Sequence, residues 1–396
     1  MRVSNTVGDY VIRVHGNPGE IDPSAWDELL AAQPQPTPFV RSAYLRALHD
    51  SHSAVADTGW QPRFLTLWQG PRLAAACALY LKSHSYGEYV FDWAWADAYQ
   101  RHGLSYFPKL LGAVPFTPVP GARLLASDAA ARAALAHAMV GLARDEGLSS
   151  LHVLFVDEQD ATALAGSGCM IRHGVQFHWT QDAQVPAVDF AELLQRLHRD
   201  KRKKIQQEQR RVREAGVAFS VHEGTAIDEP LWDFFYACYC QTYREHRSTP
   251  YLTRDFFARM ARDMPDNWVL FVARRDSRPI AASLVAVDPR TRHAYGRYWG
   301  ALEHVPCLHF DACYYQPLSW CLQQGYTRFE GGAQGEHKMA RGLLPVGTRS
   351  AHWLADERFA HAVDEFLKRE GAHVGAYLDE LQEHNPFKAA HRPPSG

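Results

Sequence analysis

Residues 326–342, YTRFEGGAQGEHKMARG, contain the transition from a strand to a polar loop on which the assignment of the fold depends. The first four residues are expected to form a short strand, because Gly325 before them ends a helix. Four glycines are then interspersed with two carboxylates, an amide, an imidazole and two cations. A permissive backbone with polar side chains at the end of a strand is more typical of a ligand site than of a core.

The overall composition excludes several classes of protein. The chain has 396 residues, of which 46% are apolar, and this is enough for about two domains with substantial cores. A formal net charge of −2 excludes a globally basic nucleic-acid-binding protein, so a polyanionic partner must meet a local patch. The sequence has no apolar run of the roughly 18 residues that a membrane span needs, and residues 1–5 have no signal-like region. Its seven cysteines form no Cys-x-x-Cys pair, and we expect a cytoplasmic protein with reduced thiols.

The two halves of the chain follow the same order of expected elements. In each half, helices precede a hairpin, an aromatic strand, a helix that ends at glycine, a second strand and a His-Trp pair. The matched segments are the hairpins at 63–76 and 270–283, the aromatic strands at 90–96 and 295–300, the helices at 130–146 and 310–324, the strands at 151–156 and 327–331, and the pairs His178-Trp179 and His352-Trp353. Five pairings in one order predict a duplicated α/β unit.

The duplication predicts two domains, residues 1–182 and residues 183–396. The first domain contains an inserted proline-rich loop at 100–126, and a loop this long in a compact domain usually covers or forms a site. The second domain contains a basic helix at 189–215 and the glycine-rich loop at 330–345. We expect a site shared between the proline-rich loop of one copy and the glycine-rich loop of the other.

The basic helix is the strongest local charge in the chain. Residues 196–214, RLHRDKRKKIQQEQRRVRE, hold nine Lys or Arg against three acids. These acids are too few to pair with the cations, which favours an anionic partner: a tRNA, the phosphates of a nucleotide-linked substrate or a polyanionic surface. The alternative is a solvated helix face. The candidate anion- or tRNA-binding residues are Lys201, Arg202, Lys203 and Lys204.

The second half of the chain contains groups that suit acyl transfer to an amine. That reaction needs a proton acceptor for the amine, polarisation of the carbonyl group and a proton donor for the leaving group. The candidates are Glu330, Glu336 and His337 as proton acceptors, Tyr314 and Tyr315 as proton donors, the backbone at Gly331, Gly332 and Gly335 for the oxyanion, and Lys338 and Arg341 for carrier phosphates. Because Tyr314 and Tyr315 are about 100° apart on a helix, one of them is expected in the core.

Other chemistries have weaker support. Cys307 and Cys313 with neighbouring histidines lack the close ligand pairs of a zinc site, so no metal is expected. The hydrolase motif G-x-S-x-G and the phosphate-binding motif G-x-x-x-x-G-K-S/T do not occur. A thiol nucleophile at Cys313 would require activation by His309, one helical turn earlier.

Six sequence blocks resemble the FemAB-like family of N-acyltransferases, which is also described as peptidoglycan biosynthesis/recognition proteins. The blocks are residues 95–99, 106–110, 114–118, 297–300, 308–316 and 329–345, so the resemblance covers nearly the whole chain. It implies tandem GNAT-like (acyl-CoA N-acyltransferase) domains. Their fold class is α/β, more specifically α+β, because the sheets are mixed and mainly antiparallel. In that fold, the two strands that flank the central helix diverge and leave backbone groups free for an acyl carrier. The Fem enzymes of this kind transfer amino acids from aminoacyl-tRNA to a nucleotide- or lipid-linked peptide.

The chain departs from the resemblance in two respects. The acetyl-CoA signature of ordinary GNAT enzymes, Arg/Gln-x-x-Gly-x-Gly/Ala, is missing from both copies, and the long coiled-coil arm of some Fem proteins is absent. The blocks and loops add substrate-binding candidates, of which Lys109 and Arg123 are expected to hold an anionic acceptor. The added candidates are Tyr106, Lys109, Arg123, Trp299, Gln316 and Gln334.

We therefore expect an N-acyltransferase linked to cell-wall or peptide modification. Its co-substrate would be an aminoacyl-tRNA or an acyl-CoA, with no permanently bound cofactor, and its acceptor a small-molecule or peptide amine. We expect no membrane span and make no prediction of oligomeric state. The alternative is a non-catalytic binding module for cell-wall precursors or acidic peptides, built on a degenerate GNAT fold.

Overall fold

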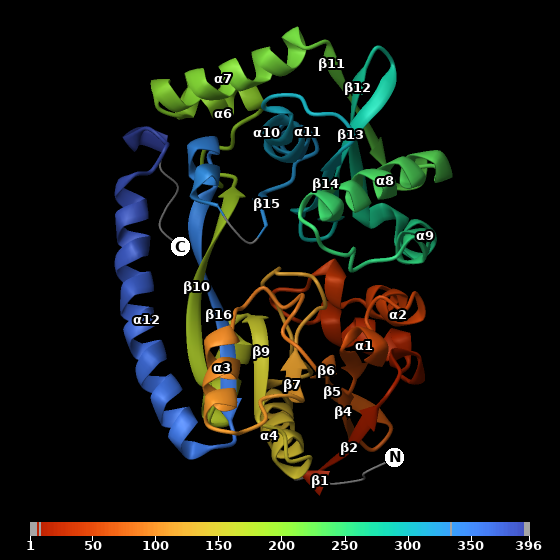
Figure 1. The fold of residues 1–396 in the computed structure, drawn as a ribbon, viewed down its shortest axis with the longest axis vertical. Helices are drawn as coiled ribbons and strands as arrows, with labels where there is room; N and C mark the ends of the chain where they lie inside the picture. Colours follow the sequence, from red (N-terminus) through yellow and green to blue (C-terminus); the bar gives the residue numbers. More distant parts are fainter. Residues whose placement is uncertain (1–5, 8, 333–334, 392–396) are drawn as a thin grey trace. The chain divides into compact units, whose positions relative to one another are not determined.

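The chain divides into two compact units in a computed structural model that describes residues 6–7, 9–332 and 335–391. Unit 1 comprises residues 1–174 and 347–376, and unit 2 comprises residues 175–346 and 377–396 (Figure 1). The sequence predicted one boundary after residue 182, whereas the chain passes between the units three times. The additional crossings arise because residues 347–376 return to unit 1.

Unit 1 contains two sheets. One has the strand order β1-β2-β4-β5-β8, and in the other β16, β9, β7, β6 and β3 follow one another. The helices and strands of this part of the chain are β1 (Thr6–Val7), β2 (Tyr10–His15), η1 (Pro18–Glu20), α1 (Pro23–Ala31), η2 (Pro38–Val40), α2 (Ser42–Asp50), η3 (Ala56–Thr58), β3 (Trp60–Pro62), β4 (Phe64–Gln69), β5 (Arg72–Cys77), β6 (Leu79–Lys82), α3 (Trp93–Arg101), β7 (Lys109–Gly112), β8 (Leu125–Ala126), α4 (Ala129–Asp145), β9 (Ser150–Val156) and α5 (Glu158–Gly166).

Unit 2 contains one sheet with the strand order β11-β12-β13-β14-β15-β10. Three elements, β10 (Met170–Thr180), β16 (Leu344–Leu354) and α12 (Glu357–Glu383), run across a boundary between the units. The other elements of unit 2 are α6 (Phe190–Arg196), α7 (Arg199–Glu214), β11 (Val217–Glu223), η4 (Gly224–Ala226), α8 (Glu229–Glu245), α9 (Arg254–Asp263), η5 (Pro265–Asn267), β12 (Trp268–Arg275), β13 (Arg278–Asp288), β14 (His293–Ala301), α10 (Leu308–Phe310), the π-helix η6 (Asp311–Tyr315), α11 (Gln316–Gln323), β15 (Arg328–Glu330), η7 (Glu336–Arg341) and η8 (Ala389–His391).

The two units share one plan, which confirms the predicted duplication. Each contains an antiparallel hairpin, β4–β5 in unit 1 and β12–β13 in unit 2. Each then contains two parallel strands that are joined through a helix: β7 and β9 through α4, and β14 and β15 through α11. The prediction of mixed, mainly antiparallel sheets is also confirmed.

The closing strands of the two copies are exchanged. The strand β16, at the end of the second half of the sequence, pairs antiparallel with β9 in unit 1. The strand β10, at the end of the first half, pairs antiparallel with β15 in unit 2. His352 therefore lies opposite His152 in unit 1, and His178 lies opposite Glu330 in unit 2. The two histidines therefore occupy equivalent positions in the two units.

One expected strand was wrong. Residues 90–96 were expected to form the counterpart of β14, but that position is taken by β7, and residues from Trp93 onward form the helix α3. The buried aromatic residues of this segment are Trp95 and Tyr99, four residues apart, so they recur with the period of a helix. They pack against Leu354, Val363 and Leu367.

Two further expectations need correction. The proline-rich loop at 100–126 includes the strands β7 and β8, which are too short to give a periodic pattern in the sequence. The basic helix at 189–215 is divided into α6 and α7. Leu197 between them is extended and forms a β-bridge with Phe387, which interrupts the helical hydrogen bonding.

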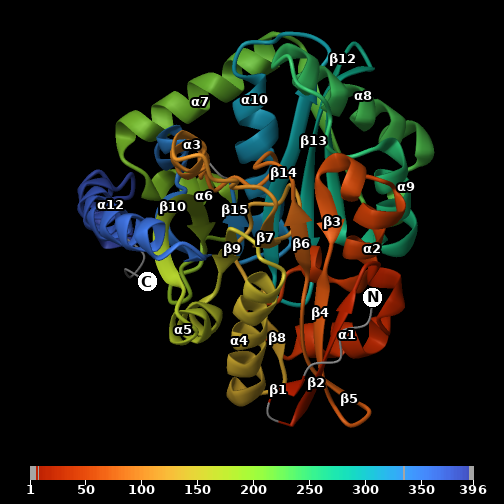
Figure 2. The same cartoon turned by 60° about the horizontal axis from the view of Figure 1, so that its bottom comes forward.

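Each unit has its own apolar core. In unit 1, α4 packs against β4, β5, β8 and β9, and Leu135 and Met139 are among its fully buried side chains (Figure 2). In unit 2, α8 packs against β13 and β14. The contact of α8 with β14 is unusually close, because a Cβ atom at Gly300 would lie 1.9 Å from the carbonyl oxygen of Cys238.

We predict that Gly300→Ala lowers the free energy of unfolding by roughly 1–3 kcal/mol or more, the range typical of overpacking. The effect is large because the new Cβ atom would meet a backbone oxygen, which cannot move aside as a flexible side chain can. The measurement is the shift in the urea midpoint followed by far-ultraviolet circular dichroism. Gly141→Ala in α4 is the matched control, since a Cβ atom there would meet nothing within 4 Å and alanine favours a helix. Equal midpoints for the two variants would contradict the packing described here.

Candidate active site

The strands β14 and β15 are paired only at their first three residues, and this produces an opening in the sheet of unit 2. His293, Ala294 and Tyr295 face residues 328–330, and no pairing between the two strands continues beyond Tyr295. Gly296 lies at the point of divergence, where a Cβ atom would approach the Phe329 ring at 3.2 Å and the Glu330 carbonyl oxygen at 3.3 Å. The register between β13 and β14 also shifts here, because Leu284 faces Tyr298 while Val285 faces Gly296. Bulges of this kind are frequent beside active sites.

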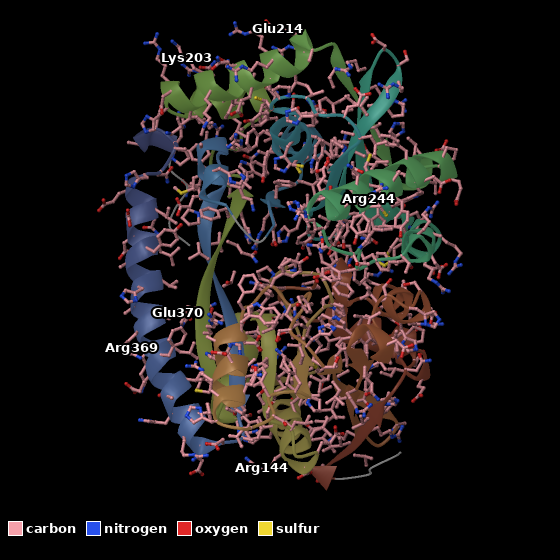
Figure 3. The ribbon with its side chains drawn as sticks, in the orientation of Figure 1. Arg144, Lys203, Glu214, Arg244, Arg369 and Glu370 are labelled. Atoms are coloured by element: carbon pink, nitrogen blue, oxygen red, sulfur yellow. The ribbon has the colours of Figure 1, made fainter. Side chains whose placement is uncertain are left out.

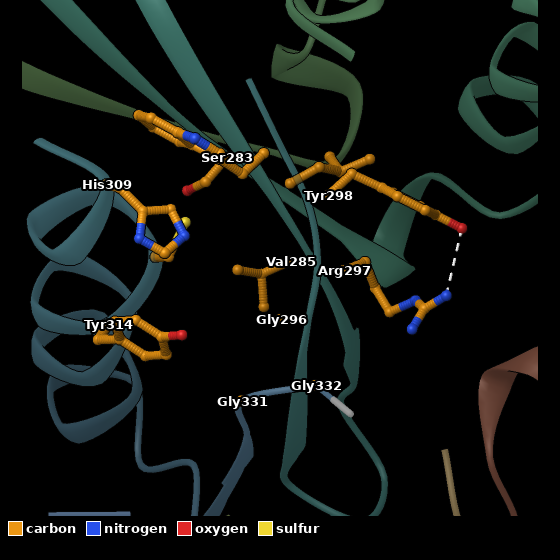
Figure 4. A pocket seen from close by; sticks show the side chains of 12 residues that line it. Ser283, Val285, Gly296, Arg297, Tyr298, His309, Tyr314, Gly331 and Gly332 are labelled. Atoms are coloured by element: carbon orange, nitrogen blue, oxygen red, sulfur yellow. Dashed lines mark hydrogen bonds between the residues drawn. The ribbon is translucent and has the colours of Figure 1, made fainter. Parts of the chain in front are cut away.

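A cavity of about 150 Å³ lies in this opening (Figure 4). Side chains from the helical segment after β14 line one side, and the strands β13 and β14 line the other. The glycine pair that follows β15 contributes backbone. The lining residues are Ser283, Leu284, Val285, Gly296, Arg297, Tyr298, Trp299, His309, Cys313, Tyr314, Gly331 and Gly332.

The π-helix η6 contributes Cys313 and Tyr314 to the lining of this cavity. Turns of this type are frequent at functional sites. The hydroxyl group of Ser283 donates a hydrogen bond of 2.6 Å to the carbonyl oxygen of Ala312, which fixes the π-helix to the sheet. The adjacent Tyr315 is also buried, but its hydroxyl group donates to Glu208 of α7 rather than lining the cavity.

Tyr314 and His337 form the clearest pair of polar groups beside the cavity. The Tyr314 hydroxyl group lies 3.3 Å from Nε2 of His337. Burial raises the pKa of Tyr314, so the phenol is protonated at neutral pH. Loss of water and the nearby charges of Arg341, Lys338 and Lys204 lower the pKa of His337, so the imidazole is neutral and can accept a proton. Tyr314 was a predicted proton donor and His337 a predicted acceptor.

Lys338 is a buried cation next to the glycine pair. Its Nζ donates a hydrogen bond of 2.8 Å to the carbonyl oxygen of Gly332, and its aliphatic chain would touch a Cβ atom at Gly331. Burial lowers the pKa of Lys338 to about 8, because a desolvated ammonium group is disfavoured. The group is still mainly charged at pH 7, and it contributes positive potential at the edge of the cavity.

Arg341 and Glu208 connect the glycine-rich segment to the basic helix. Nη2 of Arg341 donates to both carboxylate oxygens of Glu208 at 3.0 Å, and Nη1 donates to the carbonyl oxygen of His337 at 2.7 Å. Because Glu208 also accepts from Tyr315, this one carboxylate of α7 holds both η7 and the π-helix. The charge of Arg341, which was predicted to bind carrier phosphates, is thus taken up inside unit 2.

The remaining predicted residues of unit 2 have varied positions. Glu330 is buried in the sheet, where it pairs with Arg328 at 3.0 Å, and it is not among the lining residues. Glu336 is exposed and accepts a hydrogen bond from Tyr377. Gln316 donates to Asp311 at 2.9 Å. Gly335 precedes η7 with φ of 114°, and Gln334 lies outside the described residues.

The four predicted anion-binding residues lie in the first two turns of α7. Lys203 and Lys204 are exposed, and Lys203 extends away from the helix in Figure 3. Lys201 pairs with Asp200 at 3.0 Å, and Arg202 donates to Gln195 at 2.8 Å.

The three candidates of the proline-rich loop are buried within unit 1. The Tyr106 hydroxyl group donates to Asp92, and Lys109 pairs with Glu88 at 2.8 Å and with Asp92. Arg123 donates to backbone carbonyl oxygens, including that of Gly121 at 3.2 Å. The charges of Lys109 and Arg123 are therefore already paired with protein groups, and the expectation that they bind an anionic acceptor stays a prediction.

Sequence reasoning missed several residues that line the cavity. Arg297 and Tyr298 lie in the block 297–300 that resembles the FemAB-like family, so the signal was present. His309 was considered only as the group that would activate Cys313. Ser283 had no such signal, since it is one of several small residues in a buried strand.

The rival chemistries gain no support from the geometry. Burial raises the pKa of the Cys313 thiol, which keeps it from acting as a thiolate nucleophile. Within residues 6–7, 9–332 and 335–391, no group of three or more His, Cys, Asp or Glu side chains is arranged to hold a metal ion. In the same part of the chain, every helix is too short or too polar to cross a membrane.

The opening between β14 and β15 is the feature that the resemblance to the FemAB-like family leads one to expect. A model of that family, described as peptidoglycan biosynthesis/recognition, matches residues 17–389. The chain belongs to the FemAB-like family. No curated protein matches the sequence of this FemAB-like protein.

Solved structures support the same fold. The structure of L-PGS from Bacillus licheniformis matches with a TM-score of 0.52 and 12% identity, over 85% of this chain and 93% of that chain. The structure of FemX matches with a TM-score of 0.52 and 10% identity, over 87% of this chain and 98% of that chain. At such low identity these likenesses show the fold alone, and each of them extends over more than four fifths of this chain.

We predict that Glu208→Gln lowers the stability of this FemAB-like protein by about 3 kcal/mol, because it leaves the buried guanidinium group of Arg341 without its counter-charge. The urea midpoint of unfolding measures the effect. Glu214→Gln, at an exposed position on the same helix (Figure 3), is the control and should change stability by less than about 0.5 kcal/mol. If Glu208→Gln behaves like the control, the carboxylate does not hold η7 as described.

Proposed function

We propose that this FemAB-like protein is an N-acyltransferase whose acyl donor binds in the cavity between β14 and β15. The observation that carries the proposal is the pairing of Tyr314 with His337 beside a cavity that contains glycine backbone. A protonated phenol, a neutral imidazole and the cation Lys338 beside Gly332 match the three requirements of acyl transfer to an amine. The N–H of Gly331 already donates to the carbonyl oxygen of Phe177. Membership of a peptidoglycan-related family supports a cell-wall peptide as the acceptor.

The proposed reaction conserves protons through the Tyr314–His337 pair. The amine nitrogen of the acceptor attacks the carbonyl carbon of the donor, and its proton passes to Nε2 of His337. The bond from that carbon to the oxygen or sulfur of the carrier breaks, and Tyr314 gives its hydroxyl proton to the leaving atom. His337 then returns a proton to Tyr314 across their 3.3 Å contact. The negative charge on the carbonyl oxygen during the reaction is favoured by the nearby cation Lys338.

The size of the cavity limits the acyl group. A volume of about 150 Å³ is smaller than the roughly 300–1,000 Å³ of pockets that enclose a drug-sized ligand. This space suits a small acyl or aminoacyl group, whereas the carrier must extend outside the cavity. The Trp299 ring lies next to His309, with ring centroids 5.5 Å apart, and adds flat aromatic surface to the lining of the cavity.

Two acyl donors are candidates, and they differ in the carrier of the acyl group. An aminoacyl-tRNA would place phosphates along the exposed cations of α7, and Lys204 is close enough to His337 to lower its pKa. An acyl-CoA would bring phosphates and a thioester. Both carriers are polyanions that present an activated acyl group, so the basic helix is the feature to test. A cytoplasmic location stays a prediction.

We predict that Tyr314→Phe lowers kcat for transfer of the acyl group by about 100-fold while KM changes little, because the leaving group loses its proton donor. The assay supplies an aminoacyl-tRNA or an acyl-CoA with a cell-wall peptide amine and follows the acylated product by mass spectrometry. Tyr326→Phe removes a phenol from another buried position in unit 2 and serves as the control. Turnover that is unchanged in Tyr314→Phe would remove Tyr314 from the mechanism, and a wild-type protein that binds the peptide but consumes neither donor would favour the binding module.

We predict that replacing Lys201, Arg202, Lys203 and Lys204 together by alanine weakens tRNA binding and flattens its salt dependence. The slope of log K against log salt concentration should fall by roughly 0.7–0.9 for each phosphate contact that is lost. Filter binding at several salt concentrations gives this slope. The control variant replaces four exposed cations elsewhere: Arg101, Arg358, Lys368 and Arg369. Of these, Lys368 and Arg369 are adjacent on α12. If both variants keep the wild-type slope, tRNA is not the carrier that α7 recognises.

A further inference from the structure

The segment between β6 and α3 in unit 1 has its polarity inverted. Its polar residues Ser85, Glu88 and Asp92 are buried, with 3–6% of their surface exposed. Its aromatic rings face solvent, with exposed fractions of 58% for Tyr86, 38% for Tyr89, 55% for Phe91 and 43% for Trp93. Four large rings exposed within eight residues gain little from burial, so the usual driving force of folding does not explain this arrangement.

The buried side chains of the segment are all hydrogen-bonded to one lysine, Lys109. Nζ of Lys109 donates to Ser85 at 2.9 Å, to Glu88 at 2.8 Å and to Asp92. An ammonium group has three N–H donors, and all three are used on this one segment. Lys82 adds a hydrogen bond of 3.3 Å to the carbonyl oxygen of Tyr86. The segment is thus anchored at its start, middle and end.

The backbone of the segment is also constrained. Gly87 has φ of 81°, and a Cβ atom there would lie 2.6 Å from the ring of Phe116. Tyr89 has φ of 64°, which is unfavourable for a residue with a side chain. Arg172 donates to the carbonyl oxygen of Phe91 at 2.7 Å. A segment held this firmly presents its rings in a fixed arrangement, and fixed rings lose little entropy when they bind a ligand.

Two of the exposed rings, Tyr86 and Trp93, form a row with His84. The centroids of Tyr86 and Trp93 are 5.3 Å apart, and those of His84 and Tyr86 are 5.2 Å apart. Polar edges accompany this flat apolar surface: the phenol of Tyr86 and the indole N–H of Trp93. The ring nitrogens of His84 are already used, Nε2 with the carbonyl oxygen of Thr58 and Nδ1 with the backbone N–H of Tyr86. Loss of water lowers the pKa of His84, so this ring is neutral at pH 7.

The size and charge of this surface distinguish among possible partners. Four rings of 150–250 Å² that are about half exposed offer roughly 400 Å², about half of what each partner of a stable protein complex contributes. The neighbouring cations are paired, Arg101 with Asp97 at 2.9 Å and Arg172 with Glu370 at 2.8 Å, so the attraction to an anionic lipid surface is weak. A neutral ligand with flat C–H faces and many hydroxyl groups fits best.

We propose that the aromatic surface formed by residues 84–93 of unit 1 binds a neutral oligosaccharide. The C–H face of a pyranose ring packs on Tyr86 and Trp93, and its hydroxyl groups bond to the polar edges of the rings. The surface accommodates one or two sugar units. This inference concerns unit 1 and does not depend on the transferase activity proposed for unit 2.

The test is a titration of the full-length protein with the β-1,4-linked tetramer of N-acetylglucosamine, followed by calorimetry or by NMR. Wild-type protein should bind, and Trp93→Ala and Tyr86→Ala should each weaken binding at least tenfold without changing the circular dichroism spectrum. Phe366→Ala, which removes an exposed ring from α12, should leave binding unchanged. Cellotetraose, which lacks the acetamido groups, identifies the sugar: equal binding indicates recognition of the pyranose ring alone.

A second variant tests the role of the anchored backbone. Lys109→Met removes the central anchor but no ring, so it should weaken binding of the tetramer even though every contact residue remains. The ring variants decide the question if this variant fails to fold. The proposal is overturned if wild-type protein binds neither tetramer, or if both ring variants bind as tightly as wild type. It is also overturned if the ring variants instead lose sedimentation with phosphatidylcholine vesicles, or lose a concentration-dependent dimer in analytical ultracentrifugation.

Discussion

The site in unit 2 depends on a strand that is only three residues long. The strand β15 is paired on both sides over residues 328–330, parallel to β14 and antiparallel to β10. Phe329 at its centre is fully buried, so the strand cannot move without losing a large apolar contact. Pairing with β14 ends at Glu330. Gly331 still donates its N–H to the carbonyl oxygen of Phe177 in β10 at 3.3 Å, so the sheet opens on the side of β14 alone. The cavity exists because the sheet is held firmly up to this point and opens directly after it.

The same plan in unit 1 continues differently. There, β7 and β9 are parallel at three pairs of residues, and the chain then returns so that Gly121 forms a parallel bridge with Val156. Val114, Phe116 and Val119 of the intervening segment are all buried. The proline-rich loop therefore contributes apolar side chains to the interior of unit 1. The two units share one framework and differ in the segment that follows the first parallel strand.

The sequence predicted the features that recur in both halves of the chain and the helices that end at a glycine. The two hairpins, the helix α4, the strands β9 and β15 and the equivalence of His178 with His352 all follow from patterns that recur in both halves. Tyr314 and His337 could be selected because they lie in polar or aromatic clusters. The sequence could not predict that Arg341 and Lys109 are paired inside their units, since their partners Glu208 and Glu88 are 133 and 21 residues away. The strand β7 could not be distinguished from a loop in the sequence, because its four residues are all buried and show no alternation of apolar and polar side chains.

The two units differ most clearly in how a buried lysine is paired. In unit 1, Lys109 is surrounded by two carboxylates and a hydroxyl group, and its charge stabilises the position of a surface segment. In unit 2, Lys338 is equally buried but donates to the carbonyl oxygen of Gly332, and among the residues that the structure describes it forms no ion pair with a carboxylate. Burial lowers its pKa to about 8. A neutralised lysine can hold structure but contributes little field, whereas an uncompensated one in a poorly solvated place acts on any negative charge nearby. Positive potential is therefore available at the open cavity of unit 2, where a carbonyl oxygen would become negative during acyl transfer, and is cancelled in unit 1, where it maintains shape.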